Sequence, residues 1–237
     1  SIWKWPVGSH SYVGFGDVAE GVLSDPNDDK SDPDRSVAGI MDRVWHEVPI
    51  VYYGRPDTIE FADQFILACK YYNYAWASPE MNSIGQSVLD AFKRANYPYI
   101  YSREKREDEI QREDSLKLGW KTTLATRKPM IADLVVAVKQ HAFVVYDIRI
   151  IEELRVFIWN KQGKPTANKG EHDDCVIMFA GLVQMHQRCP YNDDLSLIEE
   201  DKEPIGVYVI AGQVESHDDL EDEDLDDVLY SVDEDYV

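Results

Sequence analysis

Cysteine is scarce in this sequence, and the three that occur lie far apart. Cys69, Cys175 and Cys189 form no CxxC pair and leave an odd number. A disulfide framework and a zinc knuckle both require closely spaced or paired cysteines. The cysteine pattern therefore argues against both classes and fits a protein of the reducing cytosol.

Long hydrophobic runs are also lacking. The longest apolar stretches, such as Leu134–Val138 and Val207–Ala211, are far shorter than the roughly 20 residues that a membrane-spanning helix needs. The chain opens with no secretory signal and no initiator Met, which favours a domain excised from a longer protein. With 44% hydrophobic residues in 237, the chain can bury the core of one substantial domain plus a smaller appendage.

Basic residues are outnumbered, with 24 Lys and Arg against 45 Asp and Glu. The excess of acid lies mostly at the end of the chain. Residues 1–192 hold 23 basic and 27 acidic side chains, whereas residues 193–237 hold 1 and 18. We therefore expect a nearly balanced domain over residues 1–192 and an acidic C-terminal extension over 193–237. Its last part, residues 215–237, has 12 acids in 23 positions and is predicted to be disordered or bound to a partner.

The first half of the chain reads as three strands followed by alternating helices and strands. Two helices are predicted. One opens at Asp57 and runs to about Tyr72, and the other, Ile84–Ala95, begins at a capping-box pattern of Ser83 and Gln86. The order predicts a mixed sheet with helices on its faces. The expected strands are Tyr12–Val18, Ser36–Arg43, Val48–Tyr53, Ala75–Pro79 and Pro98–Arg103.

The second half begins with a charged segment, residues 104–128, that reads as an exposed hairpin or arm. Thr126 is expected to cap a helix running to about Gln140, and Asp147 to cap a short element, Ile148–Leu154. Glu171–Gln187 is predicted to be the last core helix. Ile205–Ala211 is predicted to be one more strand. The sequence as a whole contains no internal repeat.

Acidic residues stand at three places where they could meet. Asp17 ends the first strand, Glu80 follows another strand, and Asp173 and Asp174 open the last core helix. Carboxylates at strand ends and at a helix start can converge at one edge of a sheet, where hard divalent cations find oxygen ligands. Two such ions could activate a water and stabilise the leaving oxygen of a phosphodiester.

Each acid also has a more ordinary explanation when taken alone. Asp17 could be a turn residue, and Glu80 a solvated residue after Pro79. Asp173 and Asp174 could be favoured by the helix dipole alone. The order of the acids together with their surroundings is more specific than any one of them.

The combined pattern resembles the nuclease domain of phage large terminase subunits, over about residues 11–187. The Gly-Trp-x-Thr and His-Asp-Asp segments are its most distinctive parts. The matching segments are Asp17-x-Ala19-x-Gly21, Glu80-x-Asn82 with Gly85, Leu118-Gly119-Trp120-x-Thr122, and His172-Asp173-Asp174.

The resemblance implies a ribonuclease H-like α/β fold and a metal-dependent endonuclease that cuts concatemeric viral DNA during packaging. Two Mg²⁺ or Mn²⁺ ions would be bound by Asp17, Glu80 and one or both of Asp173 and Asp174, and we favour Asp174 as the closer ligand. Asn82 would support the site. His172 and Asp34 could lie beside it, although a surface histidine and a turn residue are the simpler readings.

The resemblance also implies partners and a location. Double-stranded DNA, an N-terminal ATPase motor, a small terminase subunit and a portal are expected partners, in the cytoplasm of the host cell. No GxxxxGK[ST] phosphate loop occurs in this chain, so no ATPase activity is expected.

The expected DNA contacts lie in Arg103–Lys128, which carries eight basic and six acidic residues. Some of these cations could contact phosphates without reading bases, although a solvated arm is an equally good explanation. Trp120 is predicted to be a core residue. Two alternatives remain for the function: another ribonuclease H-like nuclease of the resolvase or integrase type, and a non-catalytic protein-interaction domain.

Overall fold

The computed structural model describes residues 1–19, 34–82, 84–103, 117–159, 165–167 and 171–191, and two short strands nearer the C-terminus. The chain divides into two units, Ser1–Asp201 and Lys202–Val237. Most of the charged arm and of the acidic extension falls outside the described residues. None of the helices in the described ranges has the length and apolar character needed to cross a membrane.

A five-stranded mixed sheet is the centre of the first unit, with the strand order β4-β1-β2-β3-β7. Strands β1 (Tyr12–Asp17), β2 (Ser36–Asp42) and β3 (Glu47–Gly54), which match the first three predicted strands, form an antiparallel meander. Strand β4 (Trp76–Pro79) then pairs in parallel with β1, and β7 (Val144–Val145) pairs in parallel with β3. The sheet thereby puts β1 between one parallel and one antiparallel neighbour.

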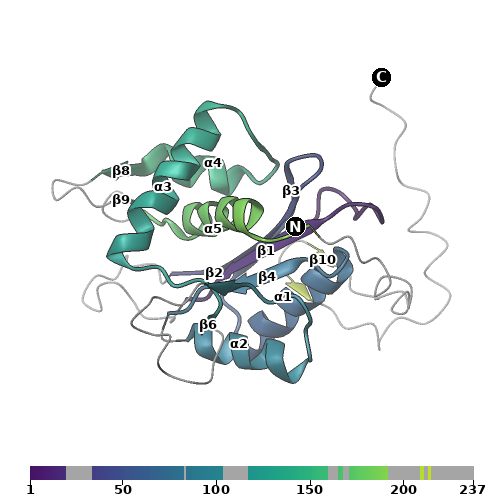
Figure 1. Cartoon of the computed structure of the whole chain (residues 1–237). Coiled ribbons are helices and arrows are strands. Elements are labelled where there is room, and N and C mark those ends of the chain that lie inside the picture. The colour runs from purple at the N-terminus through teal and green to yellow at the C-terminus, as the bar shows by residue number, and fades with distance from the viewer. Residues whose placement is uncertain are drawn as a thin grey trace. The chain divides into compact units, whose positions relative to one another are not determined.

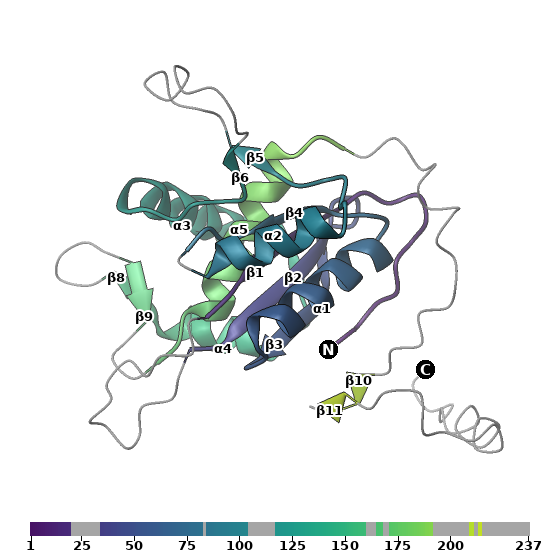
Figure 2. The ribbon, with the colours of Figure 1, turned by 90° about the horizontal axis from the view of Figure 1, so that it is seen from below.

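Two helices cover one face of this sheet. Helix α1 (Thr58–Tyr71) begins at Asp57, whose carboxylate accepts two backbone N–H bonds, and helix α2 (Gly85–Arg94) packs beside it (Figure 2). The even-numbered positions of β1 face them. A Cβ at Gly14 or Gly16 would lie 2.9–3.1 Å from side-chain atoms of Phe65, Cys69 or Ile40. The absence of a side chain at these two glycines therefore lets α1 lie close to the sheet.

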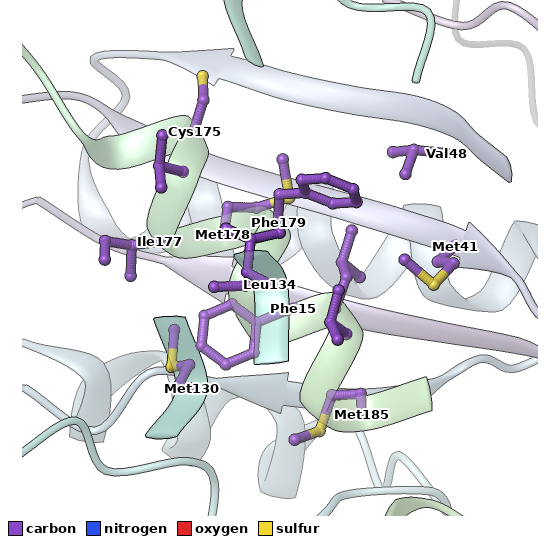
Figure 3. Close-up of a cluster of buried hydrophobic side chains, with 14 of the residues drawn as sticks. Phe15, Met41, Val48, Met130, Leu134, Cys175, Ile177, Met178, Phe179 and Met185 are labelled. Atoms are coloured by element: carbon purple, nitrogen blue, oxygen red, sulfur yellow. The ribbon is translucent and has the colours of Figure 1, made fainter. Parts of the chain in front are cut away.

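Three helices lie on the opposite face: α3 (Leu124–Lys139), α4 (Ile148–Val156) and α5 (Asp174–Arg188) (Figure 1). Helix α5 packs directly on β1 and β2. A Cβ at Gly181 would lie 2.3 Å from the ring of Phe15, so the helix and the strand touch at this point. Phe15, Met178 and Phe179 belong to the same buried cluster, shown in Figure 3.

The remaining strands form two-stranded ribbons. Strands β5 (Ser102–Arg103) and β6 (Lys117–Leu118) pair antiparallel at the base of the predicted arm. Strands β8 (Phe157–Trp159) and β9 (Pro165–Ala167) pair after α4. In the second unit, β10 (Val209–Ile210) and β11 (Gln213–Val214) pair with each other, and β10 lies within the strand expected at Ile205–Ala211.

Two predicted helix starts are wrong in detail. Helix α2 has Ile84 as its N-cap with no side-chain cap bond, and Gln86 bonds Asp90 on the helix surface. The N-cap of α3 is Thr123 rather than Thr126, and Thr126 is the third helical residue, which completes a capping box with Thr123. In both cases the true start lies within three residues of the predicted one.

Candidate metal centre

Asp17 is the last residue of β1 and, by strand alternation, shares a face with Val13 and Phe15. That face is the one on which α5 packs, because Val13 and Phe15 lie in the α5 cluster. Beyond the strand, the backbone N–H of Ala19 donates to the Ser36 hydroxyl across 3.1 Å, which holds the chain against the start of β2. Asp17 is therefore half-buried on the α5 side of the sheet edge.

Glu80 reaches the same edge from the neighbouring parallel strand. The register pairs Gly16 with Pro79, and the Glu80 N–H donates to the Gly16 carbonyl across 2.7 Å. Residues in register on adjacent strands point to the same face, so Glu80 lies beside Asp17. A bridge between Glu80 and Trp120 fixes the other side of this backbone segment.

Asn82 connects this segment to its surroundings as a structural residue. Its amide nitrogen donates to the Val18 carbonyl across 2.8 Å, and its amide oxygen accepts from the N–H groups of Ile84 and Gly85. All of these bonds are to backbone. Asn82 thus joins the end of β1 to the start of α2, the supporting role expected of it.

Asp173 and Asp174 open α5, as predicted, but their side chains differ in their partners. Asp173 forms an ion pair with Arg127 of α3. Asp174 is buried and accepts a 3.0 Å bond from the Arg35 backbone N–H at the start of β2. Asp174 therefore lies at the same edge as Asp17, and Asp173 is held by a neighbouring cation.

Asp34, His172 and Asp174 form a further group with ligand-type atoms. The Nδ1 atom of His172 lies 3.5 Å from the Asp34 carboxylate and 3.7 Å from that of Asp174. One donor atom from each of the three residues lies within 4.8 Å of the others, a geometry that could hold a metal ion. Asp34 and His172 thus lie beside Asp174.

The carboxylates repel one another in the metal-free protein. Burial, and then the charge and hydrogen bond of Glu80, raise the pKa of Asp17 well above its usual value, with further contributions from Asp174 and Asp173. Burial also raises the pKa of Asp174 to about 7, with Asp34 and Glu153 adding to it and the Arg35 N–H opposing it. The site therefore favours protons or cations over free negative charge.

Without metal, Asp174 is expected to make folding stability fall as pH rises. Its pKa in the folded protein, about 7 against an ordinary 3.8, is raised, so its contribution is fully present below pH ~4 and lost as pH passes ~7. Asp174→Asn should therefore gain about 3 kcal/mol of unfolding free energy over wild type between pH 4 and pH 8, at 1.36 kcal/mol per pKa unit with a discount for solvent.

Urea denaturation of both proteins in EDTA at the two pH values measures this gain. The control is Asp63→Asn, at an exposed aspartate of α1. A stability difference between wild type and Asp174→Asn that does not change with pH would contradict the prediction.

The residues expected to contact DNA are only partly described, because residues 104–116 of the arm lie outside the described ranges. Lys121 is exposed, but Arg127 binds the Asp173 carboxylate and also the Pro165 carbonyl at 3.2 Å. Arg127 therefore acts on the carboxylate cluster rather than as a free phosphate contact. Trp120 is 7% exposed within the α5 cluster, and its prediction as a core residue is confirmed.

Sequence reasoning missed Glu153 and the role of Arg127. Glu153 of α4 is buried and accepts bonds from backbone N–H groups of α5. Arg127 pairs with Asp173 across 46 positions of sequence. Neither residue lies in a local motif, so no signal in the sequence identifies them.

Comparison with known proteins gives a likeness of structure rather than of sequence. No family model matches the chain, and no curated protein matches it. The large terminase nuclease of the thermophilic phage G20c is similar at a TM-score of 0.55 and 14% identity, over 77% of this chain and 86% of that one. Its magnesium-bound form is similar at 0.54 and 15%, over 77% and 85%.

The nuclease domain of the large terminase of Thermus phage P74-26 is also similar, at a TM-score of 0.54 and 14% identity over 80% of this chain and 87% of that one. At these identities the likeness establishes the fold. The predicted ribonuclease H-like mixed sheet with flanking helices is confirmed, and this chain has the fold of phage large terminase nuclease domains.

Proposed function

We propose that this chain is a divalent-metal-dependent endonuclease that cuts concatemeric viral DNA during genome packaging. The observation that carries the proposal is the meeting of Asp17, Glu80 and Asp174 at one sheet edge. They come from β1, the end of β4 and the start of α5. The Glu80 backbone is tied to β1 by its N–H bond to the Gly16 carbonyl, and the Asp174 carboxylate accepts from the Arg35 N–H of β2. The solved nuclease domains of the same fold support the assignment.

The donor set fits hard divalent cations. The site offers carboxylate oxygens with one nearby imidazole, the ligand types that Mg²⁺ and Mn²⁺ accept. Asp17 and Asp174 have raised pKa values because they are buried and lie near other carboxylates, and a cation would relieve that repulsion. Arg127 already neutralises one carboxylate of the cluster, because it forms an ion pair with Asp173.

Asp17, Glu80 and Asp174 would hold the metals, with Asp173 as a further candidate ligand. Two bound Mg²⁺ or Mn²⁺ ions would activate water for in-line attack on a phosphate and stabilise the departing 3′ oxygen. Asp34 and His172 lie beside Asp174 and would face the same ions. Low sequence preference is expected, because no segment of the sequence resembles a major-groove reading helix.

The partners follow from the same proposal. Double-stranded DNA is the substrate, and an ATPase motor, a small terminase subunit and a portal would deliver it. The host cytoplasm is the expected location. We infer these partners from the packaging role rather than from any contact in the chain.

Cleavage of supercoiled plasmid by this chain tests the proposal. Nicked and linear products are expected with Mn²⁺ or Mg²⁺ and none with EDTA. Glu80→Gln, which keeps the size of the side chain and removes its charge, should abolish metal-dependent cleavage. Folded protein that cleaves equally well in EDTA, or Glu80→Gln that cleaves like wild type, would contradict the assignment.

A further inference from the structure

The start of helix α5 lacks the cap that its sequence offers. Asp173 is the N-cap residue, since its carbonyl accepts the first helical bond, from Ile177 N across 2.9 Å. An N-cap aspartate ordinarily accepts from the N–H of the second or third helical residue. Here the Asp173 side chain makes no cap bond.

Both aspartates of this turn are directed elsewhere. The Asp173 carboxylate binds the Arg127 guanidinium, and the Asp174 carboxylate accepts from Arg35 N at the sheet edge and lies near His172. The two N–H groups that Asp173 would normally accept from belong to Cys175 and Val176. Both are buried residues, so they need an acceptor other than water.

Glu153 supplies that acceptor from a different helix. Its Oε2 atom accepts from Cys175 N across 2.7 Å and from Val176 N across 3.2 Å. Glu153 is 8% exposed and lies on α4, one turn from the core residue Ile150. A carboxylate at this point also complements the positive end of the α5 dipole.

We propose that Glu153 is a positioning residue that caps α5 in place of Asp173. The Asp173 carboxylate can then bind Arg127, and the Asp174 carboxylate stays at the sheet edge, where the metal centre is proposed. The inference rests on the proposed function. Without the Glu153 acceptor, the N-cap carboxylate of Asp173 would be the ordinary acceptor for the two N–H groups. Its rotation would break the ion pair with Arg127 and shift the turn that carries Asp174.

Two variants separate the position of the acceptor from its charge. Glu153→Gln keeps an oxygen acceptor at the same reach and loses the charge, whereas Glu153→Asp keeps the charge and withdraws the acceptor by one methylene. Leu154→Ala is the matched control, because it removes packing from the same helix and leaves the acceptor in place.

The readout is Mn²⁺ affinity by calorimetry, with the Mn²⁺ dependence of plasmid cleavage alongside. Glu153→Gln should bind Mn²⁺ within about threefold of wild type. Glu153→Asp should bind about tenfold more weakly or worse, as expected for loss of a group that orients a metal ligand. Leu154→Ala should lose stability and keep its Mn²⁺ affinity.

Weak binding by Glu153→Gln, or wild-type binding by Glu153→Asp, overturns the inference. A loss of affinity in Leu154→Ala equal to that in Glu153→Asp also overturns it, since a general loss of stability would then explain both. If Glu153→Asp does not fold, Glu153→Gln decides. Wild-type protein that binds no Mn²⁺ overturns the proposed function instead, so the two failures are distinguishable.

Discussion

Asp17→Asn is expected to lower Mn²⁺-dependent plasmid cleavage by roughly 100-fold or more while the chain stays folded. Loss of a group that merely orients a metal ligand costs about 10–100-fold, and a direct ligand should cost more. Asn has the same shape but no negative charge. Because burial, and then crowding by Glu80, Asp174 and Asp173, raises the pKa of Asp17, the variant should also be more stable than wild type in EDTA at pH 8.

Two measurements check this pair of effects: initial rates of plasmid nicking, and melting temperature with and without millimolar Mn²⁺. Mn²⁺ should stabilise wild type and have little effect on Asp17→Asn. Asp57→Asn is the control, since Asp57 caps α1 and asparagine caps helices equally well. Strong cleavage by Asp17→Asn would remove Asp17 from the site.

Gly85→Ala is expected to lower the melting temperature and to reduce cleavage more than the loss of stability explains. Alanine in a first helical turn would ordinarily be favourable. Here a Cβ at Gly85 would lie 1.8 Å from the Glu80 carbonyl oxygen and 3.3 Å from Asn82 Oδ1. The backbone that carries Glu80 must move, at a cost of about 1–3 kcal/mol for overpacking.

Gly54→Ala is the matched control for this substitution. Gly54 ends β3, and its nearest neighbours for a Cβ lie 3.7 Å away, an ordinary contact distance. Its stability should change by no more than about 0.5 kcal/mol, with cleavage unchanged. Denaturation midpoints and cleavage rates at a temperature where both variants are fully folded give the comparison. Equal behaviour of the two variants would show that the Glu80 segment tolerates displacement.

Local patterns in the sequence predict most elements near the site. Alternation predicts a strand over Tyr12–Val18, and β1 spans Tyr12–Asp17 with Asp17 at its end. Asp147 caps α4 as expected. These signals are local: strand period, cap residues and turn residues all act within a few positions. The placement of Asp17, Glu80 and Asp174 as a metal site remains a prediction, now with a geometry that supports it.

The missed caps show the limit of local signals. Thr123 and Thr126 both have hydroxyls that can cap, and the choice between them depends on backbone geometry rather than on residue type. Ahead of α2, the Asn82 side chain accepts from the N–H groups of Ile84 and Gly85 and also donates to the Val18 carbonyl. A contact with another strand decides which of several suitable residues is used.

Partners brought together by packing could not be predicted at all. Glu153 and Cys175 N are 22 positions apart, and Arg127 and Asp173 are 46 positions apart. Each belongs to a helix whose pattern explains its own formation but not its neighbours. Their pairing depends on how α3, α4 and α5 pack together on the sheet, which is a property of the whole fold.

Helix α5 packs closely on β1, with Gly181 against Phe15. This packing has a consequence for the synthesis of the chain. The helix that brings Asp174 to the sheet edge follows all five strands of the sheet in the chain, so the ribosome delivers it after the whole sheet. A nascent chain would hold Asp17 and Glu80 without their third carboxylate. The proposed nuclease would therefore be inert until translation has passed residue 174, and messages cut short before that point would yield no active enzyme.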